Sequence, residues 1–535
     1  MLEDEIALLS TTYVPGVLET PRIKARLEAQ IAEMKAIEQE IATLEARIVN
    51  LKAQRMDLEK RCEVGEALLA PIRKIPMEIL EEIFVQSIPR FFLHYLEIDQ
   101  AEDPLHPSDE HPHDARARLG KVCRKWRSVT EAAPRVWSTI SLDRPLPPDI
   151  GIVDKWLQKS RSCPLDLYIR PYSWFKGGDR SHLPDIFLLL RREIPRLRCF
   201  IGWVESYDEI HPLFPPYEFT EAPNMAVFGV LCVSDTVEED EPGTGTIHAP
   251  NLRSIVLSNT EGILKALTAT SFSTLRRLTT SLSNKASSSY LPTLALCRNL
   301  EFLHWTDCHE SGKDIVGRRH TKVTLSALKQ MTYSAADLED TPDFFSSIRV
   351  PALENLKFDP SCIRATPFHP PAAGMLRSLL QDGFSSLRQL ELWHASLLGP
   401  ETMELFNQLV NLDTICVVDC GLEPPFFDAL NPHSNTSAAA CPRLVKLMIV
   451  NGRYPISDLV DFIQRRTQPD VEERSPGYVT SVVVEAYAME AELLALQQTH
   501  GSTLHLRQMP VVRFGPFPRG AGTDRVHFSP IGVRK

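Results

Sequence analysis

Leu387-Arg-Gln-Leu390-Glu-Leu392-Trp-His-Ala395-Ser-Leu397 is the stretch that decides the fold. Apolar and polar residues alternate from Leu390 to Trp393, and this period of two predicts a short strand with one buried face. The same spacing returns at Leu412-Asp-Thr-Ile415-Cys-Val417-Val-Asp-Cys420-Gly-Leu422. A pattern that recurs at a fixed step predicts a series of stacked units, each of which supplies one strand.

Weaker copies of this pattern cover most of the chain. They start at Leu197, Met225, Leu252, Leu275, Leu300, Leu328, Leu353, Leu444 and Val479. The steps from 197 to 444 range from 23 residues (252 to 275) to 34 residues (353 to 387), and the longer steps indicate loop insertions. The consensus Leu-x-x-Leu-x-Leu-x-x-(Asn/Cys/small)-x-Leu is that of the leucine-rich repeat. Residues 143–506 are therefore predicted to form an irregular leucine-rich-repeat solenoid with a parallel sheet on its concave side.

Helical stretches precede several of the predicted strands. Residues 400–409 precede Leu412, residues 456–466 precede Val479, and residues 184–194 precede Leu197. Repeated strand-helix units place the chain in the α/β class. We expect residues 152–169 to form a first, irregular unit and 493–506 to form a closing cap. Residues 507–535, which are rich in Gly, Pro and Arg, are predicted to be a flexible tail.

A different pattern occupies the N-terminal region. From Ile23 to Cys62 apolar residues recur at alternating steps of four and three, between residues that favour helix. With Leu27 at heptad position a, Ile dominates position a and Leu dominates position d, which favours a parallel dimer. After an N-terminal tail, 1–20, residues 21–64 are thus predicted to be a coiled coil that forms a homodimer. The alternative is one amphipathic helix that packs against its own chain.

Three short apolar segments follow the heptads. The stretch Ile75-Pro-Met-Glu-Ile-Leu-Glu-Glu-Ile-Phe84 predicts a helix that starts at the proline and has one apolar stripe. A second helix is expected from Leu119 to Val129, and a strand-like piece from Ile140 to Leu142. These pieces are too small to bury their apolar residues alone. They predict a helical module that completes its core with a partner.

Together these segments resemble an F-box, over residues 70–142. The family pattern Leu-Pro-x-Glu-Ile-Leu-x-x-Ile-Phe matches 75–84, Val-Cys-Arg-x-Trp matches 122–126, and Pro followed by Leu-Trp-x-x-Ile-x-Leu matches 134–142. With the heptads before it, the arrangement is similar to mushroom-type fungal F-box proteins. Two departures from the pattern matter: Ile75 replaces the usual Leu, and an insert, 90–114, separates the two halves.

The resemblance implies a substrate-receptor subunit of an SCF-type cullin ubiquitin ligase. Such a receptor docks on the Skp-type adaptor of the ligase through its F-box, and the solenoid would hold a protein substrate. The adaptor-binding residues carried over from the family pattern are Pro76, Ile79, Leu80, Ile83, Phe84, Val122, Cys123 and Trp126. One alternative is a ligase-independent interaction scaffold. A second is a hydrolase or metal enzyme hidden in the C-terminal half.

Period-two alternation also predicts which strand residues would touch the substrate. Leu390 and Leu392 are expected to point into the core, as is Trp305, which occupies a Leu position of its repeat. The residues predicted to face outward and to bind substrate are Phe302, His304, Asn355, Lys357, Asp359, Gln389, Glu391 and Trp393. An outward Trp is a favoured hot-spot residue. The alternative is that Trp393 folds over the rim and packs on a neighbouring repeat.

No catalytic or cofactor-binding pattern stands out, so the chain is expected not to be an enzyme and to need no cofactor. The cluster from His106 to Asp114 contains three His residues, and the prolines in and just before it, Pro104, Pro107 and Pro112, favour a solvated loop over a metal site. The basic run from Arg116 to Arg127 is expected to be the solvated face of a helix. Cys416 and Cys420 fit framework positions of one repeat rather than a ligand pair.

Composition limits the remaining classes of function. The formal net charge of −11 argues against a chain-wide surface for nucleic acid. No apolar run approaches the ~18 residues of a membrane helix, and the acidic N-terminus has no basic segment typical of a secretory signal. The 11 cysteines are scattered singly, which is typical of reduced thiols in the cytoplasm or nucleus.

Overall fold

The computed structural model divides the chain into two units, Met1–Leu80 and Glu81–Lys535. The residues that it describes are 13–17, 19–69, 71–89, 111–142, 150–169, 183–204, 207–215, 217–232, 245–258, 261–282, 287–307, 322–335, 341–360, 372–381, 383–397, 400–422, 424–431, 441–467, 479–486, 494–495, 497–498 and 503–508. Most of the predicted insert, 90–110, and of the predicted tail, 509–535, lie outside this set, as do residues 1–12. The fold is mixed α/β, with a long N-terminal helix and a large parallel sheet.

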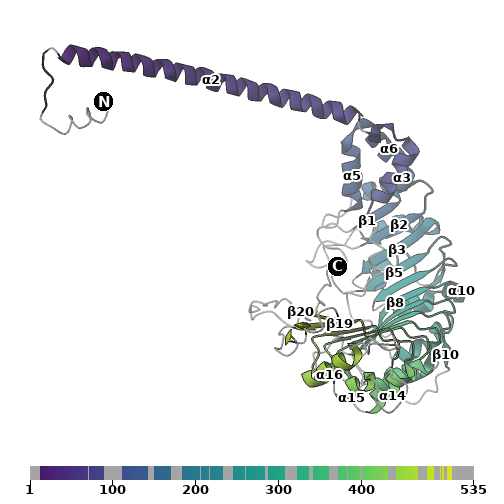
Figure 1. Cartoon of the computed structure of the whole chain (residues 1–535). Helices are drawn as coiled ribbons and strands as arrows, with labels where there is room; N and C mark the ends of the chain where they lie inside the picture. Colours follow the sequence, from purple (N-terminus) through teal and green to yellow (C-terminus); the bar gives the residue numbers. More distant parts are fainter. Residues whose placement is uncertain are drawn as a thin grey trace, which may run out of the picture. The chain divides into compact units, whose positions relative to one another are not determined.

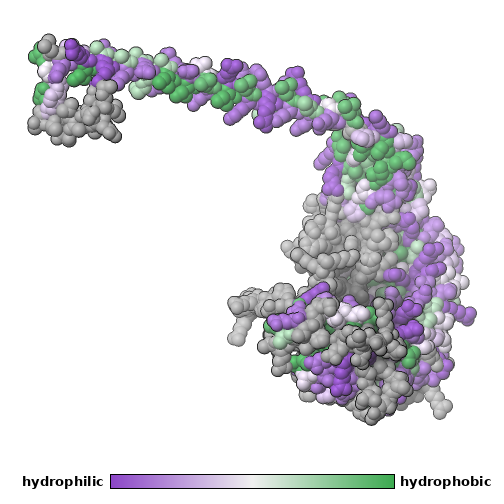
Figure 2. Space-filling view, viewed as in Figure 1, coloured by the Kyte–Doolittle hydropathy of each residue, from purple (hydrophilic) through white to green (hydrophobic). Residues whose placement is uncertain are grey.

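One long helix makes up most of the first unit (Figure 1). This helix, α2 (Glu19–Leu69), has 51 residues and contains the whole predicted heptad segment. Its first turn is fixed by the Glu19 carboxylate, which accepts hydrogen bonds from the Gly16 backbone N–H at 3.0 Å and the Tyr13 hydroxyl at 2.6 Å. A short 3₁₀ turn, η1 (Pro71–Lys74), follows. The apolar heptad residues of α2 are all exposed, and Figure 2 shows them as patches along a hydrophilic rod.

Fourteen strands form the main sheet of the second unit, and every neighbouring pair is parallel. Their order follows the chain from β1 to β20, without a crossover between distant strands. The strands are β1 (Thr139–Leu142), β2 (Leu165–Ile169), β3 (Leu197–Val204), β5 (Val227–Cys232), β7 (Ser254–Ser258), β8 (Arg277–Leu282), β9 (Phe302–Asp307), β11 (Gln330–Ala335), β13 (Asn355–Asp359), β14 (Gln389–Trp393), β16 (Thr414–Val418), β18 (Lys446–Val450), β19 (Ser481–Ala486) and β20 (Leu504–Gln508).

Short strands form three small parallel sheets beside the main one. They pair β4 (Phe219–Glu221) with β6 (Thr246–His248), β10 (Val323–Thr324) with β12 (Ile348–Arg349), and β15 (Ser396–Leu397) with β17 (Gly421–Leu422). Each pair joins two successive repeats, so the chain is hydrogen-bonded to its neighbouring repeat at more than one point.

Helices connect the strands. Those at the N-terminal end of the second unit and its first repeats are α3 (Met77–Ser87), α5 (Pro112–Val122), α6 (Arg124–Ala132), η2 (Pro134–Trp137), α7 (Ile150–Ser160), α8 (Leu183–Arg191), η4 (Ile194–Arg196) and η5 (Tyr207–Ile210). The later ones are α9 (Glu261–Ala266), α10 (Ala269–Ser273), η6 (Ser287–Tyr290), α11 (Leu291–Leu294), α12 (Thr341–Ser347), α13 (Ala373–Leu380), α14 (Pro400–Gln408), α15 (Pro424–Leu430) and α16 (Ile456–Thr467). Helices α12 to α16 contact one another in chain order along one face of the sheet (Figure 1).

The predicted repeat starts coincide with the strands of the main sheet. Leu197 opens β3, and Met225 and every later predicted start lie two residues before a strand. All of these first residues are buried, as are Leu390, Leu392 and Trp305. The predicted parallel sheet and its alternation are therefore confirmed. The sheet begins at β1, within the segment that resembles an F-box, and β20 ends at Gln508, just past the predicted cap.

Asparagine side chains tie successive repeats together. Asn224, Asn251, Asn299 and Asn411 each stand one residue before a repeat start. Each side-chain amide donates a hydrogen bond to a backbone carbonyl of the preceding repeat, at 2.6 to 2.7 Å: the acceptors are Pro195, Pro223, Ser273 and Ser385. This interaction satisfies carbonyls that the strand ladder leaves unpaired at the turn.

The helices between α3 and the sheet differ from the sequence-based prediction in two ways. The single helix expected from Leu119 to Val129 is wrong, because the chain is extended at Cys123 (φ −160°) and divides there into α5 and α6. The Cys123 thiol caps α6 by accepting from the Trp126 N–H at 3.5 Å. In addition, α5 begins at Pro112, inside the predicted insert, because His111 caps it by accepting from the His113 N–H at 3.1 Å.

Candidate functional site

The residues predicted to bind substrate lie on the open face of the main sheet, which is the face opposite to the buried side chains such as Leu390 and Leu392. Strand register aligns Phe302 with Asn355 and Gln389 through β11, and aligns His304 with Lys357 and Glu391 in the next row. Gln389 is exposed, and the other predicted residues of the strip are partly exposed: Phe302, His304, Asn355, Lys357, Asp359, Glu391 and Trp393. The structure therefore brings all of them to one side of four adjacent strands, β9, β11, β13 and β14.

Trp393 forms the centre of a compact polar cluster on this face. The Lys357 ammonium lies 4.7 Å from the centre of the indole and 3.6 Å from a Glu391 carboxylate oxygen. The indole N–H donates a hydrogen bond to that same carboxylate. Cation–π attraction thus joins the ring to Lys357 of the neighbouring strand β13. Trp393 is partly exposed on this face, and whether it binds a substrate or only packs on the neighbouring repeat stays a prediction to be tested.

Four polar residues continue this cluster along the strand ends. His394 Nδ1 lies 3.1 Å from Asp359 Oδ1, and His394 Nε2 lies 3.8 Å from Asp419 Oδ2. Asn451 in turn donates a hydrogen bond to Asp419. His394, Asp419 and Asn451 each follow a strand and have positive φ angles, of 49°, 51° and 49°. The repeat places the same left-handed turn in three successive strands, and Asp and Asn are common in that conformation.

Sequence reasoning missed His394 and Asp419 because it considered only the alternating strand positions. The available signal was the polar residue that follows each strand in successive repeats, at 394, 419 and 451. It also missed the apolar side of the strip. Register aligns Trp393 with Val418 on β16 and Val450 on β18, so an apolar row continues from the indole.

The open face changes character toward the first strands. There Tyr168, Cys199, Ile201 and Val227 form a small buried cluster of their own, separate from the main core. Next to it, on the same face, the Asp166 carboxylate accepts two hydrogen bonds from Arg198, at 2.8 and 2.5 Å. Asp166 is itself buried, so this bidentate pair is what satisfies its charge. The exposed polar strip is therefore a property of the middle strands.

The predicted adaptor-binding residues of the first unit are Pro76, Ile79 and Leu80. Pro76 and Ile79 are exposed. Leu80 is fully buried, which leaves it no surface for a direct contact with a partner.

The predicted adaptor-binding residues of the second unit also include both exposed and buried side chains. Ile83 and Val122 are exposed by 41% and 57%, whereas Phe84 is fully buried. The Phe84 and Trp126 rings pack against each other with centroids 4.8 Å apart. Cys123 is partly buried and is used as the cap of α6. Phe84 and Cys123 thus hold the helices together, and Ile83 and Val122 remain available to a partner.

The described residues contain no cluster of His, Cys, Asp and Glu suited to a metal ion. None of the cysteines among them forms a disulfide. Burial raises the pKa of the Cys416 and Cys420 thiols to about 12, which keeps both protonated and unreactive. No helix in the described part of the chain is long and apolar enough to span a membrane.

Comparison with models of known protein families found no match, and comparison with curated proteins found no similar sequence. A proposal about function therefore rests on the residues and their geometry.

Proposed function

We propose that this chain is the substrate-receptor subunit of an SCF-type cullin ubiquitin ligase. In this proposal residues 70–142 are an F-box that docks on the Skp-type adaptor, and the strands from β1 to β20 belong to a leucine-rich-repeat solenoid that holds a protein substrate. Transfer of ubiquitin belongs to other subunits, and the receptor contributes proximity. The helix α2 adds a means of dimerisation.

One observation carries the adaptor half of the proposal. Ile83 and Val122, which belong to the F-box-like pattern, leave large apolar surfaces in water, while Phe84 and Trp126 of the same pattern pack together. Exposed apolar side chains on a framework of packed neighbours are typical of an interface that is completed by a partner. The pattern of buried and exposed positions therefore supports docking at Ile83 and Val122.

The part of the proposal that concerns substrate binding is supported by the residues on the open face of the sheet. The cluster of Lys357, Glu391 and Trp393 offers an aromatic side chain and charged groups that are already held in place by their neighbours. Such preorganised aromatic and charged residues lower the entropic cost of binding a protein. A protein substrate with a complementary polar and aromatic segment fits this strip best.

Binding of the full chain to a purified Skp-type adaptor, measured by biolayer interferometry, tests the proposal. We expect Ile83→Lys and Val122→Lys each to weaken binding at least tenfold, because each places a charge in an apolar contact. Leu188→Lys is the matched control: Leu188 is 50% exposed on α8 and lies outside the pattern. Its affinity should equal that of the unchanged chain.

The ligase-independent scaffold is the second candidate. The burial of Leu80 and Phe84 favours it, because these residues of the family pattern have no surface left for an adaptor. The unchanged chain can be tested at 10 times the protein concentration used for other receptors. If it does not bind the adaptor there and its fold is intact by circular dichroism, the scaffold remains as the function.

A further inference from the structure

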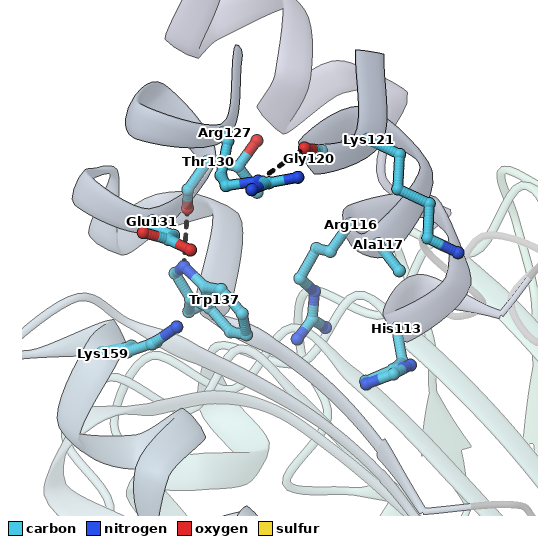
Figure 3. A pocket seen from close by; sticks show the side chains of 10 residues that line it. All are labelled: His113, Arg116, Ala117, Gly120, Lys121, Arg127, Thr130, Glu131, Trp137 and Lys159. Atoms are coloured by element: carbon cyan, nitrogen blue, oxygen red, sulfur yellow. Dashed lines mark hydrogen bonds between the residues drawn. The ribbon is translucent and has the colours of Figure 1, made fainter. Parts of the chain in front are cut away.

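A basic pocket of about 270 Å³ lies in the second unit, among α5, α6, η2 and α7 (Figure 3). Its cationic lining residues are Arg116 and Lys121 from α5, Arg127 from α6 and Lys159 from α7. Glu131 is the one carboxylate of the lining, and Trp137 forms an aromatic wall. The run of basic residues that was expected to be solvated thus turns one member, Arg116, into the interior.

Arg116 is buried to an unusual degree for a charged residue, with 3% of its surface exposed. One guanidinium nitrogen, Nη2, donates a hydrogen bond to the Thr139 carbonyl of β1. The other two nitrogens, Nε and Nη1, have no hydrogen-bond partner among the residues that the structure describes. Burial lowers the pKa of this guanidinium to about 10, a sign of how strongly the site disfavours an uncompensated charge.

Aromatic rings hold the cations in position. The Arg116 guanidinium lies 5.2 Å from the centre of the Trp137 ring and 5.8 Å from that of Trp156. Lys159 Nζ lies 4.0 Å from the Trp137 ring, and Figure 3 shows the indole between the two cations. The indole N–H is fixed by a 2.7 Å hydrogen bond to the Thr130 carbonyl. The Trp137 ring is therefore in contact with the two cations and is not available to stack on a nucleobase.

The positive charge of the pocket is only partly compensated within the described residues. Arg116, Lys121, Arg127 and Lys159 form no ion pair there, although Arg127 donates a hydrogen bond to the Gly120 carbonyl at 3.1 Å. Four cations face a single carboxylate, Glu131. An anion in the pocket would offset part of the cost of burying the Arg116 charge.

We propose that this pocket binds a phosphate monoester group. A phosphate monoester carries close to two negative charges at pH 7 and three acceptor oxygens, which suits a lining with four cations and one carboxylate. The volume exceeds that of the phosphate alone and leaves room for the atoms next to it. The group could come from a phosphorylated side chain of a peptide or from a small organic phosphate, and the pocket recognises the chemistry that they share.

This site is independent of adaptor docking, since it uses neither Ile83 nor Val122. The test uses the full chain with O-phosphoserine, with a phosphoserine peptide and with the same peptide unphosphorylated, by isothermal titration calorimetry and thermal melting. Both phosphorylated probes should bind and raise the melting temperature, and the unphosphorylated peptide should do neither. Tighter binding of the peptide than of O-phosphoserine would identify a phosphorylated protein as the source, and equal binding would identify a small phosphate.

Matched variants separate the pocket from general charge effects. Lys159→Met and Arg116→Met should each weaken binding of O-phosphoserine at least tenfold. Lys155→Met removes the same charge one turn earlier on α7, outside the pocket lining, and should bind as the unchanged chain does. Without phosphate, Arg116→Met should melt no lower than the unchanged chain, because it removes an unpaired buried charge.

Two results would overturn the proposal. One is the absence of binding by either phosphorylated probe at millimolar concentration. The other is an equal loss of binding in Lys155→Met and Lys159→Met, which would assign the effect to surface charge. If Arg116→Met does not fold, Lys159→Met alone still decides the question, because Lys159 is an exposed residue that the core does not need.

Discussion

His394 Nδ1 lies 3.1 Å from Asp359 Oδ1, so a histidine after β14 is joined to the last residue of β13. Asp419 approaches the other ring nitrogen, at 3.8 Å. Burial by itself lowers the pKa of His394, but the hydrogen bond to Asp359 and the charges of Asp359 and Asp419 outweigh it, and the pKa is raised. The folded chain therefore binds a proton at His394 more tightly than the unfolded chain does.

We predict a specific pH dependence of stability from this relationship. Because the folded pKa is raised, the stabilisation is complete below pH 6.5, the ordinary value for histidine, and is lost as the pH rises through the folded pKa. The difference in unfolding free energy between the unchanged chain and His394→Asn should thus be largest at pH 5 to 6. It should shrink and level off toward pH 9, as urea titrations across this range can show.

His394→Asn is the suitable reference for this measurement. Residue 394 has a φ of 49°, and Asn is among the non-glycine residues that best tolerate this conformation, as Asn451 does at the corresponding turn. The variant removes the titrating group and keeps the turn. A difference in stability that does not change with pH would refute the role of His394 as a proton-dependent link.

The two tryptophans on strands β9 and β14 are predicted to differ in their contribution to stability. Trp305 is fully buried; it stacks on Phe344 and meets Tyr290 edge to face, with ring centroids 5.4 and 5.8 Å away. Trp305→Ala should lower the free energy of unfolding by about 3–5 kcal/mol. Trp393→Ala removes surface contacts with Lys357, Glu391 and His394 and should cost about 1 kcal/mol. Urea denaturation of both variants would check the order, and equal costs would place Trp393 in the framework.

Trp393→Ala also tests the open face as a binding strip. We expect the variant to lose capture of the substrate while its melting temperature stays within a few degrees, since the ring lies on the surface of the sheet. Gln408→Ala, at an exposed residue of α14 outside the strip, is the control and should retain capture. If the Trp393→Ala variant still captures the substrate, the substrate-binding surface lies elsewhere on the chain.

The sheet could be predicted from the sequence because its physics is local. The sequence itself contains an apolar residue at each repeat start and alternating apolar residues within each strand. The strands from β3 to β19 therefore follow from Leu197, Met225 and their later equivalents, which are buried. The outward direction of Gln389 and Glu391 follows from the same alternation. These features need no knowledge of what lies across the core.

The helices before the sheet could not be predicted in the same detail, because their features depend on contacts distant in the sequence. The break at Cys123 has no proline at its position, and helices α5 and α6 on either side of it pack against each other. Arg116 lies within an apparently solvated basic run, yet it is buried beside Trp137 and Trp156. The charge pattern alone cannot show which of several cations will face the interior.

The asparagines between repeats are predicted to stabilise the stack. Asn251→Ala removes the 2.7 Å hydrogen bond to the Pro223 carbonyl and should lower the free energy of unfolding by about 1 kcal/mol. Asn50→Ala, on α2, serves as a control that removes the same side chain away from the sheet. Urea denaturation should distinguish the two variants. An equal effect of both substitutions would show that the hydrogen bonds of these asparagines do not stabilise the stack.

The long helix α2 is predicted to form a homodimer through its heptads. At ~1.5 Å per residue, its 51 residues span roughly 75 Å, and the heptad residues along this length leave their apolar side chains about half exposed, as at Ile41 (50%) and Ile48 (49%). A surface of that kind is stable in water when a second helix covers it, so a coiled coil is the expected state.

Two pairs of lysines test this dimer. Ile41→Lys with Ile48→Lys places charges in adjacent a layers and should give a monomer by light scattering at micromolar concentration, because each buried ammonium would face its copy in the partner helix. Ala42→Lys with Val49→Lys adds the same two charges one residue further along, at b positions that point to solvent, and should leave the dimer intact. A monomeric unchanged chain at that concentration would refute the dimer, and dissociation by both pairs would attribute the effect to net charge instead of to the heptad seam.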